Sequence, residues 1–200
     1  MKRLIILGAV AILLGAILIG TLFLILGGPP ALNGTLLDPP MSAPDFELTS
    51  VDGTVRKSDF DGKIVVIFFG YTFCPDVCPT TLSRLRETMV LLGHQASEVQ
   101  VLMVSVDPER DTPERVAAYA HDFNPDFVGL TGEPEKIATV AADFGIFHSK
   151  AEGSAETGYL VDHTAAVLVL NREGDTRLIW AFETTPQQMA RDLNYLIAKG

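Results

Sequence analysis

An uninterrupted apolar stretch near the amino end constrains this chain more than any other feature. Residues 4–26 read LIILGAVAILLGAILIGTLFLIL, in which Thr21 is the only polar side chain. As a helix rising about 1.5 Å per residue, the stretch spans roughly 34 Å, slightly more than a hydrocarbon core of about 30 Å. Lys2 and Arg3 precede it, and the next charged residue is Asp38. The positive-inside rule therefore predicts a cytoplasmic amino terminus and export of the rest.

A cleaved signal peptide is the alternative interpretation of this stretch. The apolar region of a signal peptide has about 7–15 residues and ends at a small-residue cleavage site. This run is longer, lacks a persuasive A-x-A site, and has no cysteine after it for lipoprotein processing. We therefore expect a transmembrane anchor over residues 1–28, a Pro-rich linker over 29–42 and one exported domain over 43–200.

Composition and net charge argue against some classes of function. The 200 residues are 48% hydrophobic with a formal net charge of −10, and all 25 acidic residues lie beyond residue 37. An acidic domain argues against nucleic-acid binding, because affinity for phosphate backbones comes largely from Lys and Arg. Two cysteines are too few for a disulfide scaffold. In an oxidising compartment they need a role in catalysis, in metal binding or in a single disulfide.

The order of predicted elements indicates the fold. Short apolar runs at 64–69 and 99–106 predict strands buried on both faces. Thr-Pro pairs at 112–113 and 185–186 each predict an N-cap followed by a first-turn proline. The remaining predicted elements are a hairpin over 45–60, a helix from Pro79 to Gly93, a strand at 127–130, a helix over 134–144 and a hairpin over 164–182. This order predicts a mixed sheet with helices on both faces. It corresponds to an α/β, thioredoxin-like fold with an N-terminal hairpin and an inserted strand and helix.

The two cysteines lie where the first buried strand leads into a helix, in the sequence FGYTFCPDVCP (69–79). Proline is tolerated in the first helical turn only, so we expect Cys78 to cap the helix and Cys74 to lie in the preceding loop. A helix N-terminus favours thiolates over thiols. A thiolate serves as a nucleophile or as a metal ligand, so both chemistries stay open here. Asp76 has three possible roles: its carboxylate alters the acidity of the thiols, contacts a partner, or is solvated in the loop.

A second motif, Val161-Asp162-His163-Thr164, helps to choose between these chemistries. In thioredoxin folds this junction faces the cysteine loop, and disulfide-exchange enzymes place a cis-proline there. This chain has no proline between Pro134 and Pro186 and offers His163 instead. Two thiolates and an imidazole suit Cu(I) and also accept Cu(II) or Zn(II), although three ligands are too few for a closed structural zinc site. Asp162 either holds the imidazole tautomer as a hydrogen-bond acceptor or caps a turn.

Four ordered motifs, FGYTFCPDVCPTTL, VSVDPERDTPE, GLTG and YLVDHTA, resemble those of the Sco/SenC family. These are membrane-anchored copper proteins of cytochrome c oxidase assembly, and the resemblance covers nearly the whole exported domain. It implies that Cys74, Cys78 and His163 bind copper, as Cu(I) or Cu(II). It also implies delivery of the metal to, or preparation of, the dinuclear copper centre of oxidase subunit II, with other copper chaperones as partners.

Three functions follow from these residues. The leading hypothesis is a copper metallochaperone with no turnover chemistry of its own. The alternative is a thiol–disulfide oxidoreductase in which Cys74 and Cys78 reduce the cysteines of the oxidase copper site. A thioredoxin-fold peroxidase is less favoured, because Tyr71 stands where peroxiredoxins carry the Thr three residues before the reactive cysteine, and Thr72 is one place off. A short amino end without an Arg- and Ser-rich presequence favours a bacterial inner membrane, with the domain in the periplasm.

Two further expectations concern residues outside the cysteine and histidine motifs. The segment from Asp107 to Pro113 matches the family, and we interpret its physical role as helix capping. His94, His121 and His148 lie in polar or helix-end contexts, so we expect them on the surface.

Overall fold

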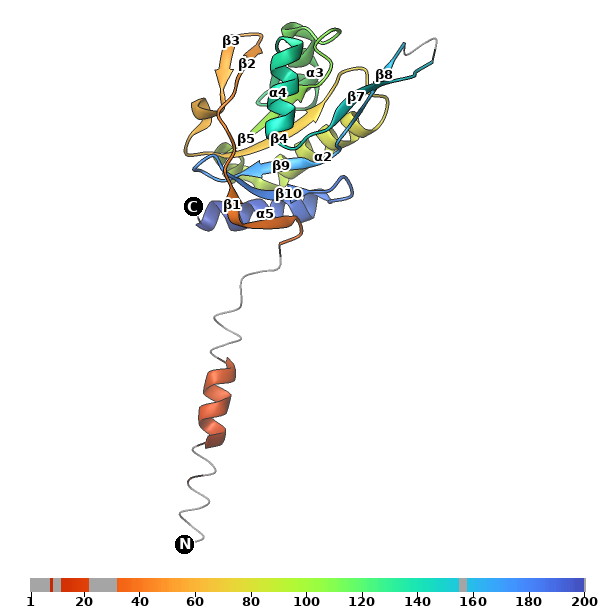
Figure 1. Cartoon of the computed structure of the whole chain (residues 1–200). Helices are drawn as coiled ribbons and strands as arrows, with labels where there is room; N and C mark the ends of the chain where they lie inside the picture. The colour runs from red at the N-terminus through yellow and green to blue at the C-terminus, as the bar shows by residue number, and fades with distance from the viewer. Residues whose placement is uncertain (1–7, 9–11, 22–31, 155–157, 200) are drawn as a thin grey trace. The chain divides into compact units, whose positions relative to one another are not determined.

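The computed structural model describes residues 8, 12–21, 32–154 and 158–199. Contacts divide the chain into two units, Met1–Ala31 and Leu32–Gly200. In the first unit, residues 12–21 are helical (Figure 1). Within the described residues, no helix is both long and apolar enough to cross a membrane. About half of the predicted transmembrane segment, residues 4–7, 9–11 and 22–26, lies outside those residues, so the anchor stays a prediction.

A six-stranded mixed sheet forms the centre of the second unit. Its strands lie in the order β1 (Thr35–Met41), β10 (Thr176–Trp180), β9 (Val167–Leu170), β4 (Ile64–Gly70), β5 (Val99–Ser105) and β6 (Val128–Leu130). The last three strands of this order are parallel to one another, whereas β9, β10 and β1 each pair antiparallel to their neighbours. The mixed sheet predicted from the sequence is confirmed.

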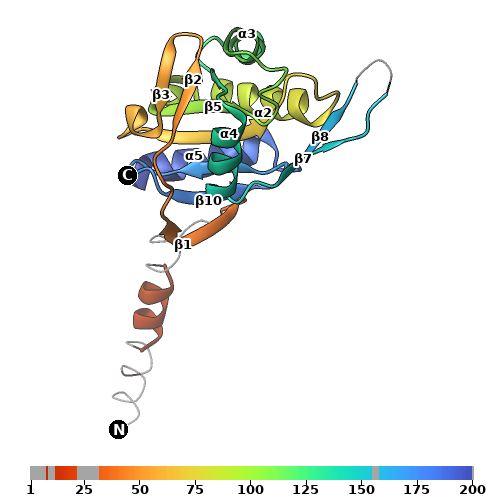
Figure 2. The same ribbon diagram turned by 45° about the horizontal axis from the view of Figure 1, so that its top comes forward.

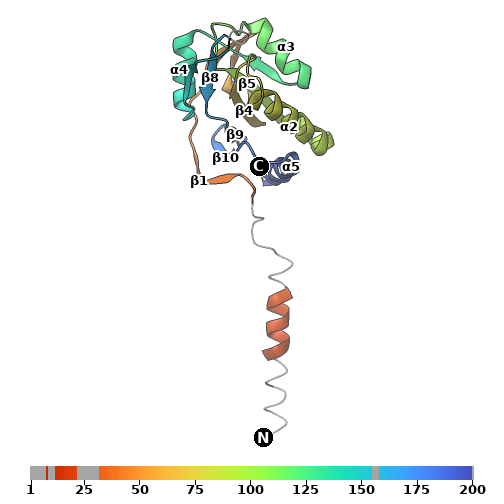
Figure 3. The ribbon, with the colours of Figure 1, turned by 90° about the vertical axis from the view of Figure 1, so that its right-hand side faces the viewer.

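Helices cover both faces of this sheet. They are α2 (Val77–Leu92), α3 (Pro113–Phe123), α4 (Pro134–Asp143) and α5 (Pro186–Lys199), with short 3-10 helices η1 (Lys57–Phe60) and η2 (Gly93–Glu98). Figure 3 shows α2 and α5 side by side on one face and α4 on the other. The predicted start of α3 is confirmed, because the Thr112 hydroxyl accepts the N–H of Arg115 and Pro113 is the first helical residue.

The core lies on both faces of β4, all seven residues of which are buried. Side chains alternate across a strand, so Phe68 and Phe69 point to opposite faces. The Phe69 ring packs against Phe144 at the end of α4, with ring centroids 5.9 Å apart. Burial on both faces explains why this strand is continuously apolar. It also fixes the carboxyl end of β4, from which the cysteine loop leaves.

The N-terminal hairpin is confirmed as β2 (Glu47–Ser50) and β3 (Gly53–Arg56). Strand β1 is a difference from the sequence analysis, which expects a spacer over 29–42. It pairs with β10 at the edge of the main sheet, and its two prolines, Pro39 and Pro40, fall where one side has no neighbouring strand. An edge strand tolerates proline because N–H groups on its outer side are not needed for pairing.

The hairpin made of β7 (His148–Ala151) and β8 (Leu160–His163) was not predicted from the sequence. These two strands form their own two-stranded sheet, separate from the main one. Figure 2 shows the pair projecting from the body of the unit. The segments HSKA and LVDH lack the apolar alternation that predicts a strand. His163, the residue singled out by sequence, ends the second of these strands.

Candidate metal centre

The cysteine loop joins the carboxyl end of β4 to the start of α2. The helix begins at Val77, with Asp76 in the N-cap position. Cys78 is therefore the second helical residue, and the expectation that it caps the helix is wrong. Pro79 still falls in the first turn, where its missing N–H leaves no helical hydrogen bond unmade. Cys74 lies in the loop, as predicted.

The structure brings the three predicted ligands together. The ligand atoms of Cys74, Cys78 and His163 all lie within 4.8 Å of one another. Cys78 Sγ is 3.6 Å from His163 Nε2, and the Cys78 backbone N–H donates to Cys74 Sγ at 3.4 Å. Cys78 is fully buried, whereas the other two residues are partly exposed. The cluster is therefore exposed to solvent through Cys74 and His163.

The two thiols differ in acidity. A hydrogen bond from the Cys78 thiol lowers the pKa of Cys74 to about 3, helped by His163 and by the backbone N–H groups of Asp76 and Cys78, while burial opposes the shift. The pKa of Cys78 is raised, because its proton is held by Cys74 and because the side chain is buried beside that negative charge. The pair at neutral pH is thus one thiolate, Cys74, and one thiol, Cys78.

A backbone carbonyl fixes the His163 ring. The Nδ1 atom lies 3.2 Å from the carbonyl oxygen of Thr164. A carbonyl only accepts hydrogen bonds, so Nδ1 donates to it and Nε2 faces the Cys78 sulfur. The rings of Phe68 and Tyr71 stand edge-on to the imidazole, with centroids 6.2 and 6.0 Å away.

The two aspartates proposed as supporting residues lie apart from these contacts. Asp162 is exposed on β8, and the structure places the Thr164 carbonyl at His163 Nδ1. Asp76 is also exposed, and its carboxylate accepts a hydrogen bond from the Thr80 hydroxyl at 3.4 Å. The contribution of Asp76 to the site is made by its backbone N–H, which helps to lower the pKa of Cys74.

One histidine lies closer to the site than its sequence context indicates. His94 and His121 are exposed, as predicted, but His148 is half-buried and stands opposite His163 in the β7–β8 pairing. Burial and the neighbouring His163 lower the pKa of His148. The signal that was missed is the hairpin itself, because pairing across it brings together two histidines fifteen residues apart in sequence.

The donor set determines what the cluster can bind. Two sulfurs and one imidazole nitrogen are soft or intermediate donors, which favour Cu(I) and other soft cations over Mg²⁺ or Ca²⁺. One donor is already a thiolate, and the second loses its proton when a cation replaces it. Three protein ligands leave a coordination position open. The cluster therefore fits a soft metal ion.

Comparisons with known proteins agree with this geometry. Among curated proteins, the mitochondrial protein SCO2 homolog of Bos taurus is 40% identical over 133 residues, covering 65% of this chain and 50% of that protein. An SCO2-like protein of Rickettsia conorii is 31% identical over 147 residues, covering 72% of each. The chain thus spans about half the length of the cattle relative and more of the bacterial one.

Solved structures extend the likeness to the fold. A structure of Bradyrhizobium japonicum ScoI with copper bound is 37% identical, with a TM-score of 0.70, and covers 77% of this chain and 98% of that one. The solution structures of apo Sco1 from Thermus thermophilus give 40% identity, a TM-score of 0.75 and coverage of 86% and 99%. The fold is therefore the thioredoxin-like α/β fold of these proteins. Because the SCO1/SenC family model also matches residues 35–198, this chain belongs to the SCO1/SenC family.

Proposed function

We propose that this chain is a copper metallochaperone that binds one copper ion through Cys74, Cys78 and His163. The observation that carries the proposal is the convergence of two sulfurs and one imidazole nitrogen within 4.8 Å. This donor set matches the preference of Cu(I) for thiolates and also accepts Cu(II). Support comes from a relative of known structure, the copper-bound ScoI of Bradyrhizobium japonicum, which is 37% identical.

The exposure of the ligands supports metal transfer rather than storage. Copper arriving from solvent or from a partner meets Cys74 and His163 before Cys78, because Cys78 is fully buried and the other two ligands are partly exposed. Phe68 and Tyr71, both buried, limit water around the imidazole. We propose that the recipient is the dinuclear copper centre of cytochrome c oxidase subunit II and that other copper chaperones supply the metal. This assignment rests on family membership.

The proposed location is a bacterial inner membrane. The apolar run over 4–26 anchors the chain once, the amino terminus is cytoplasmic because Lys2 and Arg3 precede the run, and the unit that carries the cysteines lies in the periplasm. Protease treatment of spheroplasts tests this topology. Degradation of the copper domain in intact spheroplasts is the expected result, and protection of that domain contradicts the proposal.

Copper stoichiometry tests the metal site. The full chain is reduced anaerobically in detergent and titrated with Cu(I), beside Cys74→Ser, Cys78→Ser and His163→Ala. The expected result is one tightly bound copper per wild-type chain and a loss or sharp weakening of binding in each variant. Binding that is indifferent to His163 refutes the three-ligand site.

The acidic thiol favours a second candidate function, thiol–disulfide exchange with the oxidase copper site. Cys74 is a partly exposed thiolate at neutral pH, and the Cys78 thiol donates a hydrogen bond to it. A thiolate attacks the partner disulfide, and the second thiol then resolves the mixed disulfide, which leaves Cys74 and Cys78 oxidised and the partner reduced. Reduction of an oxidised subunit II fragment by His163→Ala at the wild-type rate supports this function. Inactivity of the wild-type chain in that assay excludes it.

A further inference from the structure

The hairpin that carries His163 must be held against the cysteine loop by contacts other than sheet pairing. Strands β7 and β8 pair with each other only, within the described part of the chain. His163 ends β8, whereas Cys74 and Cys78 belong to the segment that follows β4. The separation of imidazole and sulfurs therefore depends on the short connection from His163 to β9, which pairs with β4, and on side chains that link the two segments.

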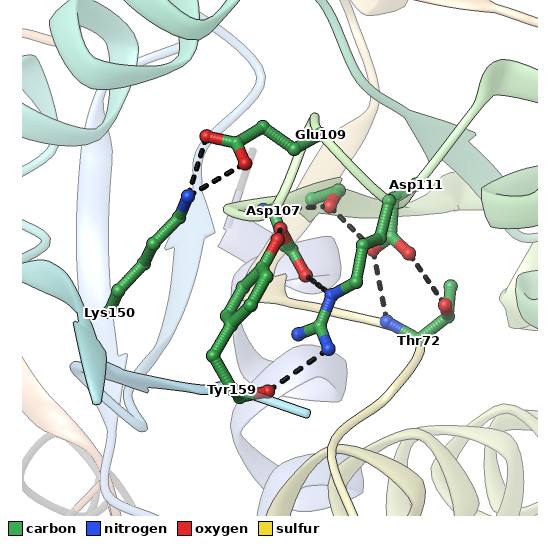
Figure 4. Close-up of polar contacts among 8 residues, drawn as sticks. Thr72, Asp107, Glu109, Asp111, Lys150 and Tyr159 are labelled. Carbon is green, nitrogen blue, oxygen red and sulfur yellow. Dashed lines mark hydrogen bonds and ion pairs between the residues drawn. The ribbon is translucent and has the colours of Figure 1, made fainter. Parts of the chain in front are cut away.

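One set of links ties the hairpin to the loop after β5. The Tyr159 hydroxyl donates to Asp107 Oδ1 at 2.6 Å, and the Asp107 Oδ2 atom accepts from Arg110 Nε at 2.5 Å. The Arg110 guanidinium also donates to the Tyr159 carbonyl at 3.0 Å and lies 3.7 Å from the centre of the Tyr159 ring. Figure 4 shows Asp107 and Tyr159 facing each other from these two segments.

These links are shielded from solvent. The side chain of Asp107 is 1% exposed and that of Arg110 is 18% exposed. Burial and the hydrogen bond to Asp107 raise the pKa of Tyr159 to about 12, so its hydroxyl keeps the proton that it donates across the physiological range. Loss of one partner of a buried charged pair strongly destabilises the local structure, because the other charge is left buried and unpaired.

A second set of links ties the same loop to the cysteine loop. Asp111 is fully buried and accepts the Thr72 N–H at 3.0 Å, the Thr72 hydroxyl at 2.6 Å and the Ser105 hydroxyl at 2.6 Å (Figure 4). On the other side, the Arg110 guanidinium lies 4.5 Å from the centre of the Phe73 ring. Phe73 directly precedes Cys74, so Arg110 contacts both the hairpin and the cysteine loop.

The loop between these two sets is itself a tight turn. The backbone N–H groups of Arg110 and Asp111 both donate to the Asp107 carbonyl, at 3.1 and 3.0 Å, and the Asp107 N–H donates to the Ser105 hydroxyl at 3.0 Å. Helix capping, the role expected from sequence, is carried by Thr112 alone. The carboxylates of Asp107 and Asp111 point instead to the hairpin and to the cysteine loop.

We propose that the loop Asp107–Asp111 sets the spacing between His163 and the two cysteines, with Arg110 as the positioning residue that couples them. The inference rests on the proposed metal site and assigns to this loop a role in metal affinity. Arg110 touches none of the three ligands in the contacts described, and acts by holding Tyr159, four residues before His163 on the same hairpin.

A matched control lies on the same loop. Glu109 forms an ion pair with Lys150 of β7 at 2.7 Å, and both side chains are more than half exposed. This pair also joins the loop to the hairpin, but exposed ion pairs contribute little because water screens them. Lys150→Gln removes this cross-link and the contact of Lys150 Nζ with the Tyr159 ring, 4.7 Å from its centre, and leaves the hydrogen bonds of Tyr159 with Asp107 and Arg110 in place.

The test measures Cu(I) affinity of the full reduced chain in detergent, with a chromophoric Cu(I) chelator as the competitor. Arg110→Gln is expected to weaken binding by about 10- to 100-fold, the range seen when residues that orient metal ligands are replaced. Lys150→Gln is expected to stay within about twofold of wild type. Tyr159→Phe keeps the ring and loses one hydrogen bond, and it serves as the second variant if Arg110→Gln does not fold. It is expected to weaken Cu(I) binding by about tenfold. Wild-type affinity in both Arg110→Gln and Tyr159→Phe overturns the proposal.

A double-mutant cycle separates positioning from general destabilisation. When His163 is already Ala, adding Arg110→Gln is expected to change Cu(I) affinity by less than about twofold, because the contact that Arg110 positions is gone. An equal loss of affinity with and without His163 shows that Arg110 acts in another way and overturns the proposal.

A readout without metal distinguishes failure of this inference from failure of the proposed function. If wild type binds no Cu(I) through His163, the proposed function fails, and nuclear Overhauser effects in the metal-free protein decide the positioning. Effects between the His163 ring and the rings of Phe68 and Tyr71 are expected in wild type and in Lys150→Gln, and are expected to be lost in Arg110→Gln. Their full retention in Arg110→Gln overturns the proposal.

Discussion

Replacing Gly70 by Ala tests how closely the end of β4 is packed against the cysteine that it supports. A Cβ atom at this position meets Phe68 Cε1 at 2.6 Å and Cys78 Sγ at 3.0 Å. The ring and the sulfur are both fully buried, so neither can move into solvent. The Gly70 carbonyl also accepts the Val106 N–H at 2.8 Å, which ties the backbone in place. The added methyl group must therefore displace Cys78 or the Phe68 ring.

The expected cost follows from overpacking a close-packed interior. An extra methylene in such a core destabilises a protein by about 1–3 kcal/mol. With a urea m value of about 2 kcal/mol/M, a loss of 2 kcal/mol lowers the unfolding midpoint by about 1 M. We expect Cu(I) affinity to fall as well, because the added methyl group lies 3.0 Å from Cys78 Sγ, closer than an ordinary contact.

Two further glycines serve as controls in urea unfolding followed by circular dichroism. At Gly129 a Cβ comes within 2.5 Å of the Val116 backbone, far from the cysteines along the chain, so Gly129→Ala is expected to lose stability and keep Cu(I) affinity. At Gly132 the nearest atom is Leu48 Cδ2 at 3.4 Å, an ordinary contact, so Gly132→Ala is expected to keep both properties. Wild-type stability and affinity in Gly70→Ala would refute the packing argument.

Three other predictions follow from single groups. Alkylation of Cys74 by iodoacetamide is expected to be nearly as fast at pH 5 as at pH 7, because a pKa of about 3 keeps Cys74 a thiolate at both values. A tenfold slowing for each pH unit below 8, as for an ordinary thiol, contradicts this expectation. Calorimetry in buffers of different ionisation enthalpy is expected to find about one proton released per Cu(I) at pH 7, from Cys78, and two protons contradict the assignment. Asp192→Ala leaves unpaired the N–H groups of Asn33, Gly34 and Trp180, each now bonded at 2.9 Å. We expect a loss of about 3 kcal/mol of unfolding free energy, measured in urea, and a loss below about 0.5 kcal/mol contradicts the role of this carboxylate.

Much of the fold could be predicted because its signals are local. The continuously apolar sequence of β4 indicates burial on both faces, and the Thr112-Pro113 pair indicates the start of α3, because Thr112 caps the helix and Pro113 suits its first turn. The cysteines and His163 were identified because their residue types are rare in this chain and lie at strand ends. The convergence of the three side chains depends on the tertiary fold, and the structure shows that their ligand atoms lie within 4.8 Å of one another.

The elements that escaped prediction depend on partners distant in sequence. Strand β1 contains Pro39 and Pro40 and has the composition of a linker, and only its pairing with β10 makes it a strand. The β7–β8 hairpin is too polar to show strand alternation, so His148 was interpreted as a surface residue. The buried bonds of Asp107 and Asp111 reach residues 52 and 39 positions away, beyond any local pattern.

X-ray absorption at the copper edge of the Cu(I)-loaded full chain tests the central claim most directly, because it reports which atoms surround the metal. Two sulfur neighbours and one imidazole nitrogen are expected in wild type. That nitrogen is expected to be lost in His163→Ala, and one sulfur is expected to be lost in Cys74→Ser or Cys78→Ser. Sulfur-only coordination in wild type, or a spectrum unchanged by His163→Ala, would contradict it.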